Sequence, residues 1–408
     1  MDTKIAPQPV KNHQPEVHET MRVHVSYWIK VAVVIGVLLA FIPSGSAQQK
    51  LKAGFIYVGP IGDYGWTHAH DVARQIVEQK LPVETLKVES VPEGGVEPFI
   101  DRLVSQGASV IFTTSFGFMD GTLAAAKKYP KVIFAHASGF KRNPNMATYM
   151  ADFYQVYYLN GLMAGALTKT DKVAYVGAFP IPEVKRHLDA WALGVRAVNP
   201  KATVQVRWIS DWFNPSKAKE ATDALIAEGA DIFAFTEDSP TVVQEAGKKK
   251  LLSFGHYSPM YKFAPDTIVS GQLVHWETIY LDFLRKVQAG TYTAENLQDV
   301  DYWWLLGQKA VEVGTQPGML INPRFVDALK AKSVKTPDLG TLSVYDLVQR
   351  RLAQMSSTPV KFDPFAGPLK DRNGVVRVKA GATMTEQELT TMEWAAPGVV
   401  GQWPNEPK

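Results

Sequence analysis

Cysteine is missing from all 408 residues of the sequence. Its absence excludes disulfide bonds, thiolate metal sites and a cysteine nucleophile, and it removes the acceptor for the lipid of a bacterial lipoprotein. An excess of charge of one sign is also missing, since the net charge is +3 with 20% charged residues. The one dense basic run, residues 248–250, is typical of a solvated helix end. We therefore expect no nucleic-acid partner.

A hydrophobic run long enough to span a bilayer is missing too. The apolar or small residues 31–42 number twelve, whereas a membrane-spanning helix needs about 20. Basic residues precede this run and the small residues 45–47 follow it, which is the order of a secretory signal. We predict that residues 1–47 are removed after Ala47 and that the mature protein is free in the periplasm. A membrane anchor is the alternative interpretation.

Recognisable catalytic motifs are absent as well. No Gly-x-x-x-x-Gly-Lys-Ser/Thr loop or Gly-x-Gly-x-x-Gly turn follows an expected strand, and the sequence has no Gly-x-Ser-x-Gly elbow. His68 and His70 are two residues apart, which on a helix points them away from each other, so they are a poor metal pair. The carboxylates form no acid/base pair recognisable by spacing. These absences favour a binding protein that needs neither metal nor cofactor.

What the sequence does have is a marked strand-to-helix turn at residues 62–71. An apolar strand pattern precedes it, and apolar residues at helical spacing follow it over residues 69–77. In a parallel α/β sheet this turn lies at the carboxyl end of a strand, where such folds bind ligands. Trp66 is placed to stack on a flat ligand, with Asp63 and Thr67 as hydrogen-bonding neighbours. The structural alternatives are Trp66 as a cover over the core and Asp63 as a helix N-cap.

From residue 52 onward, short apolar strands alternate with amphipathic helices. This alternation predicts a parallel sheet covered on both faces, and hence an α/β fold. The expected strands are 55–58, 110–112, 132–135, 148–150, 173–176, 204–207 and 232–235, with a late strand or hinge crossing at 301–306. The expected helices are 96–105, 123–128, 184–198, 276–288 and one that Pro215 opens.

An internal repetition indicates two lobes. Residues 103–112 and residues 225–234 each contain a helix end, a Gly-Ala turn and a buried strand, although coincidence of a common pattern is the alternative. Two such lobes normally hold a ligand in the cleft between them and close by hinge motion. The predicted limits are a first lobe at 48–152 with 258–302 returning to it, a second lobe at 153–257 with 303–353 returning to it, and a C-terminal appendix at 354–408 with a hairpin turn at 373–374.

The sequence resembles the basic membrane protein family of ABC-transporter substrate-binding proteins, whose characterised members bind purine nucleosides or purine bases. The similar segments are 59–67, 116–120, 126–130, 181–186, 236–240 and 394–398. The resemblance implies two Rossmann-like lobes of the type I periplasmic-binding-protein kind with an interlobe cleft. It also implies a monomeric receptor that delivers its ligand to an ABC permease in the inner membrane.

The resemblance assigns roles residue by residue. The family's ring-stacking position falls on Trp66 and its polar neighbour on Thr67, while a base-contacting acid falls on Asp120. The second-lobe contact falls on His187 or Trp191, and the resemblance leaves open which of them faces the ligand. The other predicted ligand-binding residues are Tyr57, Asp63, Phe116, Asp238 and His256.

The resemblance also bears on the ligand. The charged ribose partners of the nucleoside binders fall here on Tyr57, Pro259 and Val274, so all three charged groups are missing. A free, adenine-like purine base is therefore favoured over a nucleoside. The alternatives are a nucleoside or another flat small molecule as the ligand and, from a different class of protein, an exported nucleoside hydrolase.

Overall fold

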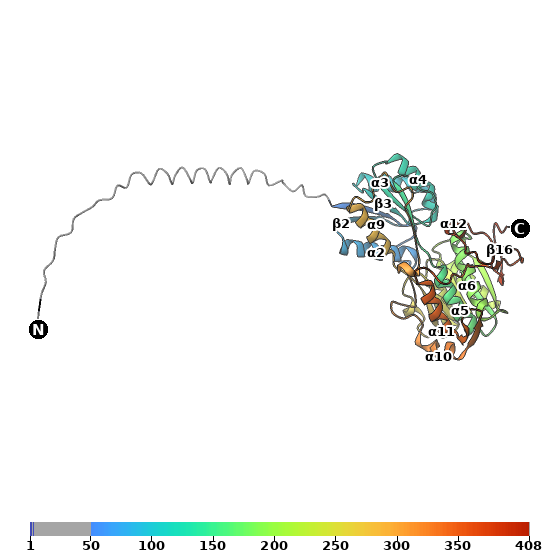
Figure 1. Ribbon diagram of the computed structural model, residues 1–408. Helices are drawn as coiled ribbons and strands as arrows, with labels where there is room; N and C mark the ends of the chain where they lie inside the picture. The colour runs from blue at the N-terminus through green and yellow to red at the C-terminus, as the bar shows by residue number, and fades with distance from the viewer. Residues whose placement is uncertain (2, 4–49, 408) are drawn as a thin grey trace. The chain divides into compact units, whose positions relative to one another are not determined.

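The computed structural model describes residues 1, 3 and 50–407 (Figure 1). The predicted signal run and the cleavage site at Ala47 lie outside these residues and stay predictions. The chain from Leu51 onward forms one compact unit. No helix within the described ranges combines the length and the apolar character needed to cross a membrane.

Parallel strands form the sheet of the first lobe, in the order β11-β5-β4-β3-β1-β2. All side chains of β3, β4 and β5 are buried, as expected where helices cover both faces. The strands are β1 (Leu51–Ile56), β2 (Val83–Val88), β3 (Val110–Thr113), β4 (Ile133–Ala137), β5 (Met146–Ala151) and β11 (Asp301–Trp304). The helices of this lobe are α2 (Trp66–Lys80), α3 (Glu97–Ser105), α4 (Met119–Lys128) and α9 (Trp276–Gln288) (Figure 1).

The sheet of the second lobe has the order β12-β10-β9-β8-β6-β7-β17, and only β12 runs antiparallel to its neighbour. Its strands are β6 (Lys172–Gly177), β7 (Thr203–Trp208), β8 (Ile232–Thr236), β9 (Leu252–Gly255), β10 (Ile268–Val274), β12 (Val311–Val313) and β17 (Val399–Val400). Its helices are α5 (Tyr154–Leu167), α6 (Pro182–Val198), α7 (Pro215–Ala227), α8 (Thr241–Lys248), α10 (Pro323–Ala331), α11 (Val344–Met355) and α12 (Glu386–Thr390).

The predicted repetition is present in three dimensions. Both sheets contain the order second, first, third, fourth, fifth strand: β2-β1-β3-β4-β5 and β7-β6-β8-β9-β10. The repeated Gly-Ala turns end α3 and α7 in the same way. Gly107 and Gly229 have φ of 88° and 90°, and the following alanine N–H donates to Leu103 O or Leu225 O at 3.1 Å in each lobe. The prediction of an α/β fold with two similar lobes is confirmed.

Helix α5 was not expected from the sequence. It is apolar all round and buried along most of its length, so it lacks the amphipathic spacing by which a surface helix is recognised. It packs closely on α6 because glycines face the partner backbone. A Cβ added to Gly161 would lie 2.4 Å from Trp191 O, and one added to Gly194 would lie 2.2 Å from Tyr158 O.

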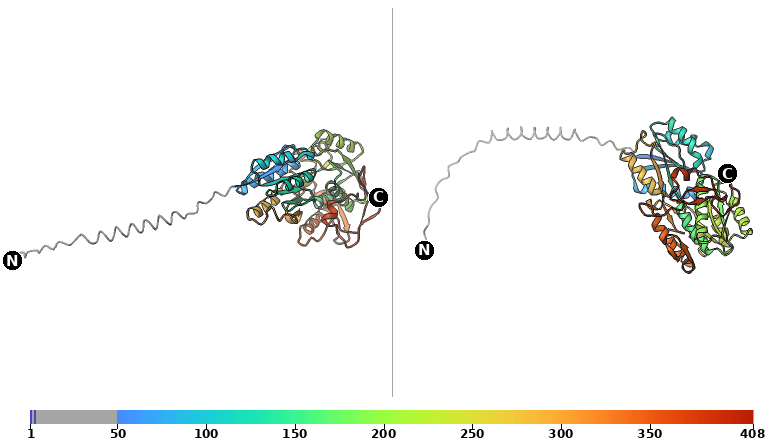
Figure 2. Two further views of the ribbon diagram at one scale, coloured as in Figure 1. Left: turned by 90° about the horizontal axis from the view of Figure 1, so that it is seen from above. Right: turned by 45° about the vertical axis from the view of Figure 1, so that its right-hand side comes forward.

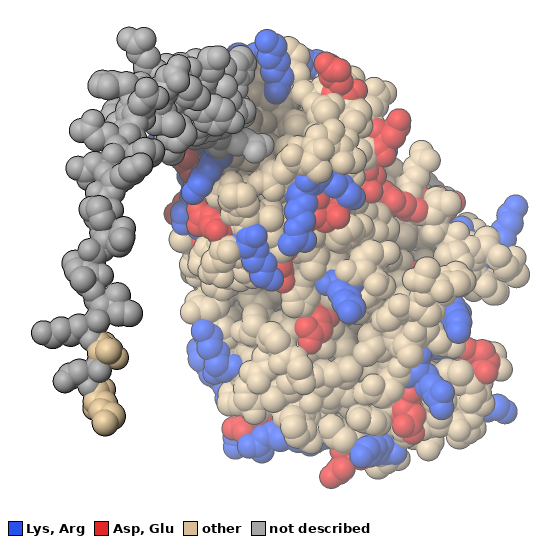
Figure 3. Space-filling view, turned by 60° about the vertical axis from the view of Figure 1, so that its left-hand side comes forward, with Lys and Arg blue, Asp and Glu red and all other residues tan. Residues whose placement is uncertain are grey.

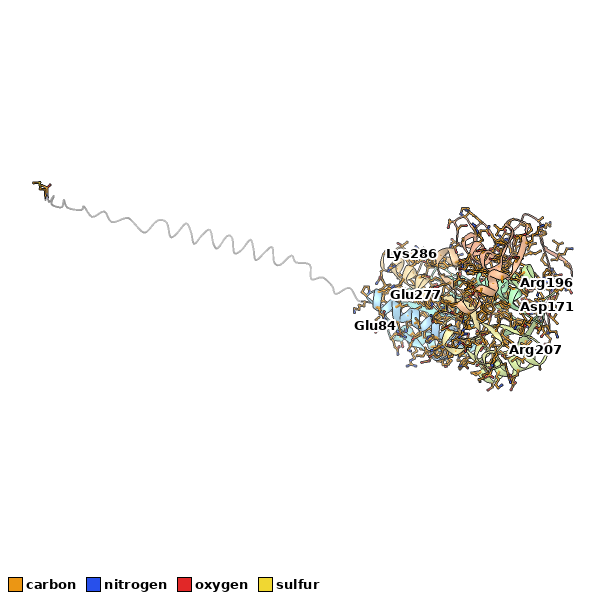
Figure 4. The ribbon with its side chains drawn as sticks, turned by 90° about the horizontal axis from the view of Figure 1, so that it is seen from below. Glu84, Asp171, Arg196, Arg207, Glu277 and Lys286 are labelled. Carbon is orange, nitrogen blue, oxygen red and sulfur yellow. The ribbon has the colours of Figure 1, made fainter. Side chains whose placement is uncertain are left out.

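One segment differs from the predicted lobe limits. Residues 258–302 were expected in the first lobe, but β10 pairs with β9 in the second sheet and completes its strand order. The chain crosses to the first lobe only at His275, before α9, which packs on α2. In Figure 4, Glu277 and Lys286 of α9 lie on the same side as Glu84 of β2, away from Asp171 and Arg207 of the second lobe. Residues 303–304 also differ, since they belong to β11 of the first sheet.

The C-terminal region packs on the second lobe (Figure 2). A hairpin of β15 (Leu369–Lys370) and β16 (Val376–Val378) surrounds the turn at Gly374, whose φ is 86°. Strand β17 then extends the second sheet beside β7, so the region is more than an appendix. The buried ring of Trp394 lies edge-on to Phe365, with 6.2 Å between the ring centroids.

Candidate functional site

A pocket of about 250 Å³ lies where the carboxyl ends of the two sheets meet. Each lining residue follows a strand of its own sheet, which is the usual ligand position in parallel α/β folds. The first lobe contributes residues after β1, β3 and β4, and the second lobe contributes residues after β6, β7, β8 and β9. The lining residues are Val58, Trp66, Ser115, Phe116, Ser138, Glu183, Trp212, Asp238 and Tyr257.

Trp66 forms a wall on the side of the first lobe. It is the first residue of α2, and its indole N–H donates to the backbone oxygen of Thr114, which fixes the ring. The ring packs edge-on against Tyr257 and Trp276, at centroid distances of 5.5 and 5.1 Å, and only 6% of the residue is exposed. Trp66 therefore belongs both to the core and to the pocket lining, so the two sequence-based interpretations are not exclusive.

Asp63 and Thr67 shape the turn and do not line the pocket. The carboxylate of Asp63 accepts the backbone N–H groups of Gly65, Thr67 and His68 at 2.8–3.1 Å, which satisfies donors at the start of α2. Burial raises the pKa of Asp63 to about 6, although these N–H groups oppose the shift. Thr67 Oγ1 accepts the N–H of Gly59 at 3.1 Å. Asp63 therefore accepts N–H groups at the helix start as the N-cap interpretation expected, but the N-cap residue itself is Gly65.

Asp238 is one of two carboxyl groups, with Glu183, on the second-lobe side of the pocket. It is 1% exposed, and neither carboxyl oxygen makes a hydrogen bond of full geometry with the described residues, although the backbone N–H of Trp66 approaches the group. Burial raises its pKa well above the usual range, and the negative charges of Asp63 and Glu237 add to the shift. A buried carboxyl group without a well-placed partner is costly, so this side chain is suited to exchange hydrogen bonds with a ligand.

Trp212 provides a second aromatic wall, this time from the second lobe. It follows β7, and its ring packs on Phe179 with 5.2 Å between the centroids. Its indole N–H has no acceptor within the part of the chain that the structure describes. Together with Trp66 and Phe116, it gives the pocket flat apolar surfaces from both lobes, which suits a planar ligand.

Trp66, Phe116 and Asp238 are thus the predicted residues that the structure brings together at the pocket. Asp120 and Tyr57 lie elsewhere. The Asp120 side chain is 76% exposed and pairs with Lys141. Tyr57 is buried within the first lobe, where its hydroxyl donates to Asp71 at 3.3 Å.

The three remaining predicted residues are buried in the second lobe behind the pocket. Trp191 packs edge-on to Phe254 at a centroid distance of 5.1 Å. His187 Nε2 lies 3.4 Å from Asp152. His256 Nδ1 lies 3.2 Å from the hydroxyl of Tyr157, and burial lowers the pKa of this histidine. None of them lines the pocket of the described chain, so their proposed ligand contacts would need a different arrangement of the lobes.

Sequence reasoning did not select several lining residues. Ser115, Ser138, Glu183 and Trp212 belong to loops or helix starts directly after expected strands, and that position was the available signal. Tyr257 lines the pocket directly after β9, whereas its predicted neighbour His256 does not. The described residues contain no group of three or more His, Asp or Glu placed to hold a metal ion.

Two α/β lobes that share a five-strand order, with a pocket between the carboxyl ends of their sheets, define the fold of the type I periplasmic-binding-protein kind. Solved structures share this fold. A solute-binding protein of an ABC transporter from Aeropyrum pernix K1 superposes with a TM-score of 0.62 at 16% identity, covering 77% of this chain and 93% of that one. One from Conexibacter woesei has a TM-score of 0.58 at 18% identity, covering 77% and 99%.

The family model for PnrA-like ABC transporter substrate-binding proteins matches residues 50–343, and the chain belongs to this family. A purine-binding protein of Brucella abortus (strain 2308) is 36% identical over 377 residues, which are 91% of this chain and 100% of that protein. A protein of Haloferax volcanii, named as a candidate glucose-binding protein of an ABC transporter, is 38% identical over 251 residues, 61% and 64% of the two chains. The resemblance seen in the sequence is confirmed, and these relatives are binding proteins rather than enzymes.

Proposed function

We propose that the protein carries a free purine base, adenine-like in shape, in the pocket between its lobes. The observation that carries the proposal is the carboxyl group of Asp238, buried without a well-placed partner between aromatic walls. A purine base offers flat faces for Trp66 and Trp212 and N–H groups for Asp238. Stacking a base on an aromatic side chain contributes about 1–3 kcal/mol.

The missing ribose partners favour a base over its nucleoside. The position that carries a ribose-contacting acid in nucleoside binders is held by Tyr57, which is buried away from the pocket with its hydroxyl bound to Asp71. A ribose would therefore lose water without gaining that partner, which costs about 1–3 kcal/mol for each unsatisfied group. The Brucella relative, named as purine-binding, supports the same ligand class.

The setting of this activity is part of the proposal. The short apolar run before Ala47 supports export to the periplasm, and membership of a substrate-binding family supports delivery to an ABC permease in the inner membrane. The face shown in Figure 3 interleaves basic with acidic side chains, which agrees with a small-molecule ligand rather than a nucleic acid. We propose that the receptor acts as a monomer and without catalysis.

The ligand class is tested on protein purified without denaturation. Mass spectrometry of the small molecules that heat releases should find a purine base. The purified protein is then incubated with adenine, adenosine and glucose and assayed for both binding and products. Saturable binding of adenine without product supports the proposal, whereas release of a free base from adenosine would identify a hydrolase instead. Saturable binding of glucose alone would assign the pocket to sugars.

A further inference from the structure

Two pocket residues from opposite lobes are hydrogen-bonded to each other. The hydroxyl of Ser138 donates to Glu183 Oε2 at 2.6 Å. Ser138 follows β4 in the first lobe, and Glu183 lies in the first turn of α6 in the second lobe. Both side chains also line the pocket. This hydrogen bond therefore joins the lobes directly at the pocket wall.

The fold holds both residues in place for this contact. Ser138 has φ of 61°, a left-handed conformation that residues other than glycine seldom adopt, and its N–H donates to Tyr149 O at 3.0 Å. Such conformations cluster at functional positions, because the surrounding structure has to enforce them. Glu183 is buried at the start of α6, where the helix dipole favours negative charge.

A second contact shows how closely the lobes approach. A Cβ added to Gly65, at the start of α2, would lie 2.5 Å from the Cα of Asp238. The φ of Gly65 is −109°, which other residues also adopt, so the need for glycine is one of space. The lobes thus meet backbone to backbone at this point and through the hydrogen bond of Ser138 and Glu183 at another.

We propose that Ser138 and Glu183 form a latch that holds the lobes closed and thereby sets how long a ligand stays bound. The two residues act as positioning residues for the closed form. Separation of the lobes breaks their hydrogen bond, so the bond opposes opening and slows release. The proposal rests on membership of the substrate-binding family and does not depend on which ligand the pocket takes.

The absence of cysteine makes a direct distance measurement practicable. Lys127→Cys in α4 and Glu220→Cys in α7 place one spin label on an exposed helix position of each lobe. Pulsed electron–electron double resonance on ligand-free protein then measures the distribution of distances between the two labels. The populations of the closed and open forms follow from that distribution. Gly65→Ala supplies the open reference, since its Cβ would collide with Asp238. Ser138→Gly keeps the left-handed backbone accessible while it removes the hydroxyl, and Glu183→Gln keeps the shape of its side chain.

A matched control removes a similar hydrogen bond inside one lobe. Thr168 Oγ1 donates to Asp231 at 2.7 Å, away from the pocket and within the second lobe, so Thr168→Ala should leave the label distances unchanged. Ser138→Gly should lower the closed-to-open ratio about tenfold, because a hydrogen bond to a charged group is worth about that much, and Glu183→Gln should lower it less, because its amide oxygen still accepts the hydrogen bond. A wild type without a closed population, or Ser138→Gly with the wild-type ratio, would overturn the proposal.

The rate of ligand release provides the second measurement. In stopped-flow displacement, Ser138→Gly should release adenine about tenfold faster than the wild type, whereas Thr168→Ala should release it at the wild-type rate. A wild-type release rate in Ser138→Gly would show that the pair does not hold the lobes closed. If adenine does not bind to the wild type, the purine proposal fails, while the label distances still decide whether the latch exists.

Discussion

Trp66 and Trp276 pack edge to face, with ring centroids 5.1 Å apart and planes at 75°. Both belong to the main hydrophobic core cluster, but of the two only Trp66 lines the pocket. Trp276, at the start of α9, is fully buried. The pair therefore allows a matched comparison. Trp66 packs in the core and also lines the pocket, whereas Trp276 packs in the core alone.

Replacing Trp66 by Phe should weaken the binding of adenine about tenfold, because part of the stacking surface and the anchoring hydrogen bond to Thr114 are lost. Trp276→Phe should lower the thermal midpoint by creating a cavity but leave the dissociation constant within about twofold. Calorimetric titration and thermal unfolding of both variants decide the matter. Wild-type affinity in Trp66→Phe would show that the ring does not face the ligand.

Asp238→Asn should change binding and stability in opposite directions. The substitution removes a buried carboxyl group that has no well-placed partner among the described residues, so the ligand-free protein should unfold at a higher temperature. It also replaces one acceptor by a donor, so adenine should bind about tenfold or more weakly. Thermal unfolding and titration of the same sample test both parts. Unchanged affinity would mean that Asp238 does not contact the base.

The structure makes clear which features the sequence could reveal. The Gly-Ala turns at Gly107 and Gly229 carry a local signal, since each needs a positive φ after a helix, and the two lobes followed from them. Helix α5 has no such signal because its apolar surface is continuous. Asp238 was found through a motif, whereas Trp212 enters the pocket through the packing of the second lobe against the first, and such a long-range relationship leaves no local pattern.

Asp63 should give stability a specific dependence on pH. Its pKa is raised from 3.8 to about 6, so its contribution is fully present below pH about 4 and is lost as the pH rises to about 6. The free energy of unfolding of the wild type minus that of Asp63→Asn should fall by about 2–3 kcal/mol across this interval, at 1.36 kcal/mol per pKa unit. Urea unfolding at several pH values measures this difference.

Asp101 provides the contrast. Its hydrogen bonds with Lys128 and Tyr129 lower its pKa, so the corresponding difference for Asp101→Asn should shrink only as the pH falls below about 4. A pH-independent difference for Asp63→Asn would show that Asp63 titrates alike in the folded and unfolded protein.

His275 joins carboxylates of the two lobes where the chain crosses between them. Its Nδ1 lies 3.2 Å from a carboxylate oxygen of Glu277 in α9, and its Nε2 lies 3.1 Å from one of Glu312 in β12. Glu277 is labelled in Figure 4. Hydrogen bonds with Glu277 and then Glu312 raise the pKa of His275 to about 9. The resulting stabilisation is fully present below the unfolded pKa of about 6.5 and is lost as the pH rises through about 9.

His275→Gln should therefore destabilise the protein by about 1 kcal/mol near neutral pH, a figure reduced for solvent screening of a partly exposed pair. Near pH 10, the variant and the wild type should have about the same free energy of unfolding, because the histidine is neutral there. Urea unfolding at neutral and alkaline pH makes the comparison. A destabilisation that persists unchanged at alkaline pH would assign the effect to packing.

Isothermal titration of the wild-type protein with adenine, guanine and hypoxanthine, each beside its own nucleoside, tests the central claim most directly. Tyr57, Pro259 and Val274 stand where nucleoside binders carry charged ribose partners, which predicts that each base that binds does so more tightly than its nucleoside. The expected advantage is about tenfold, corresponding to about 1.4 kcal/mol. Tighter binding of any nucleoside than of its own base would contradict the assignment of the pocket to free purine bases.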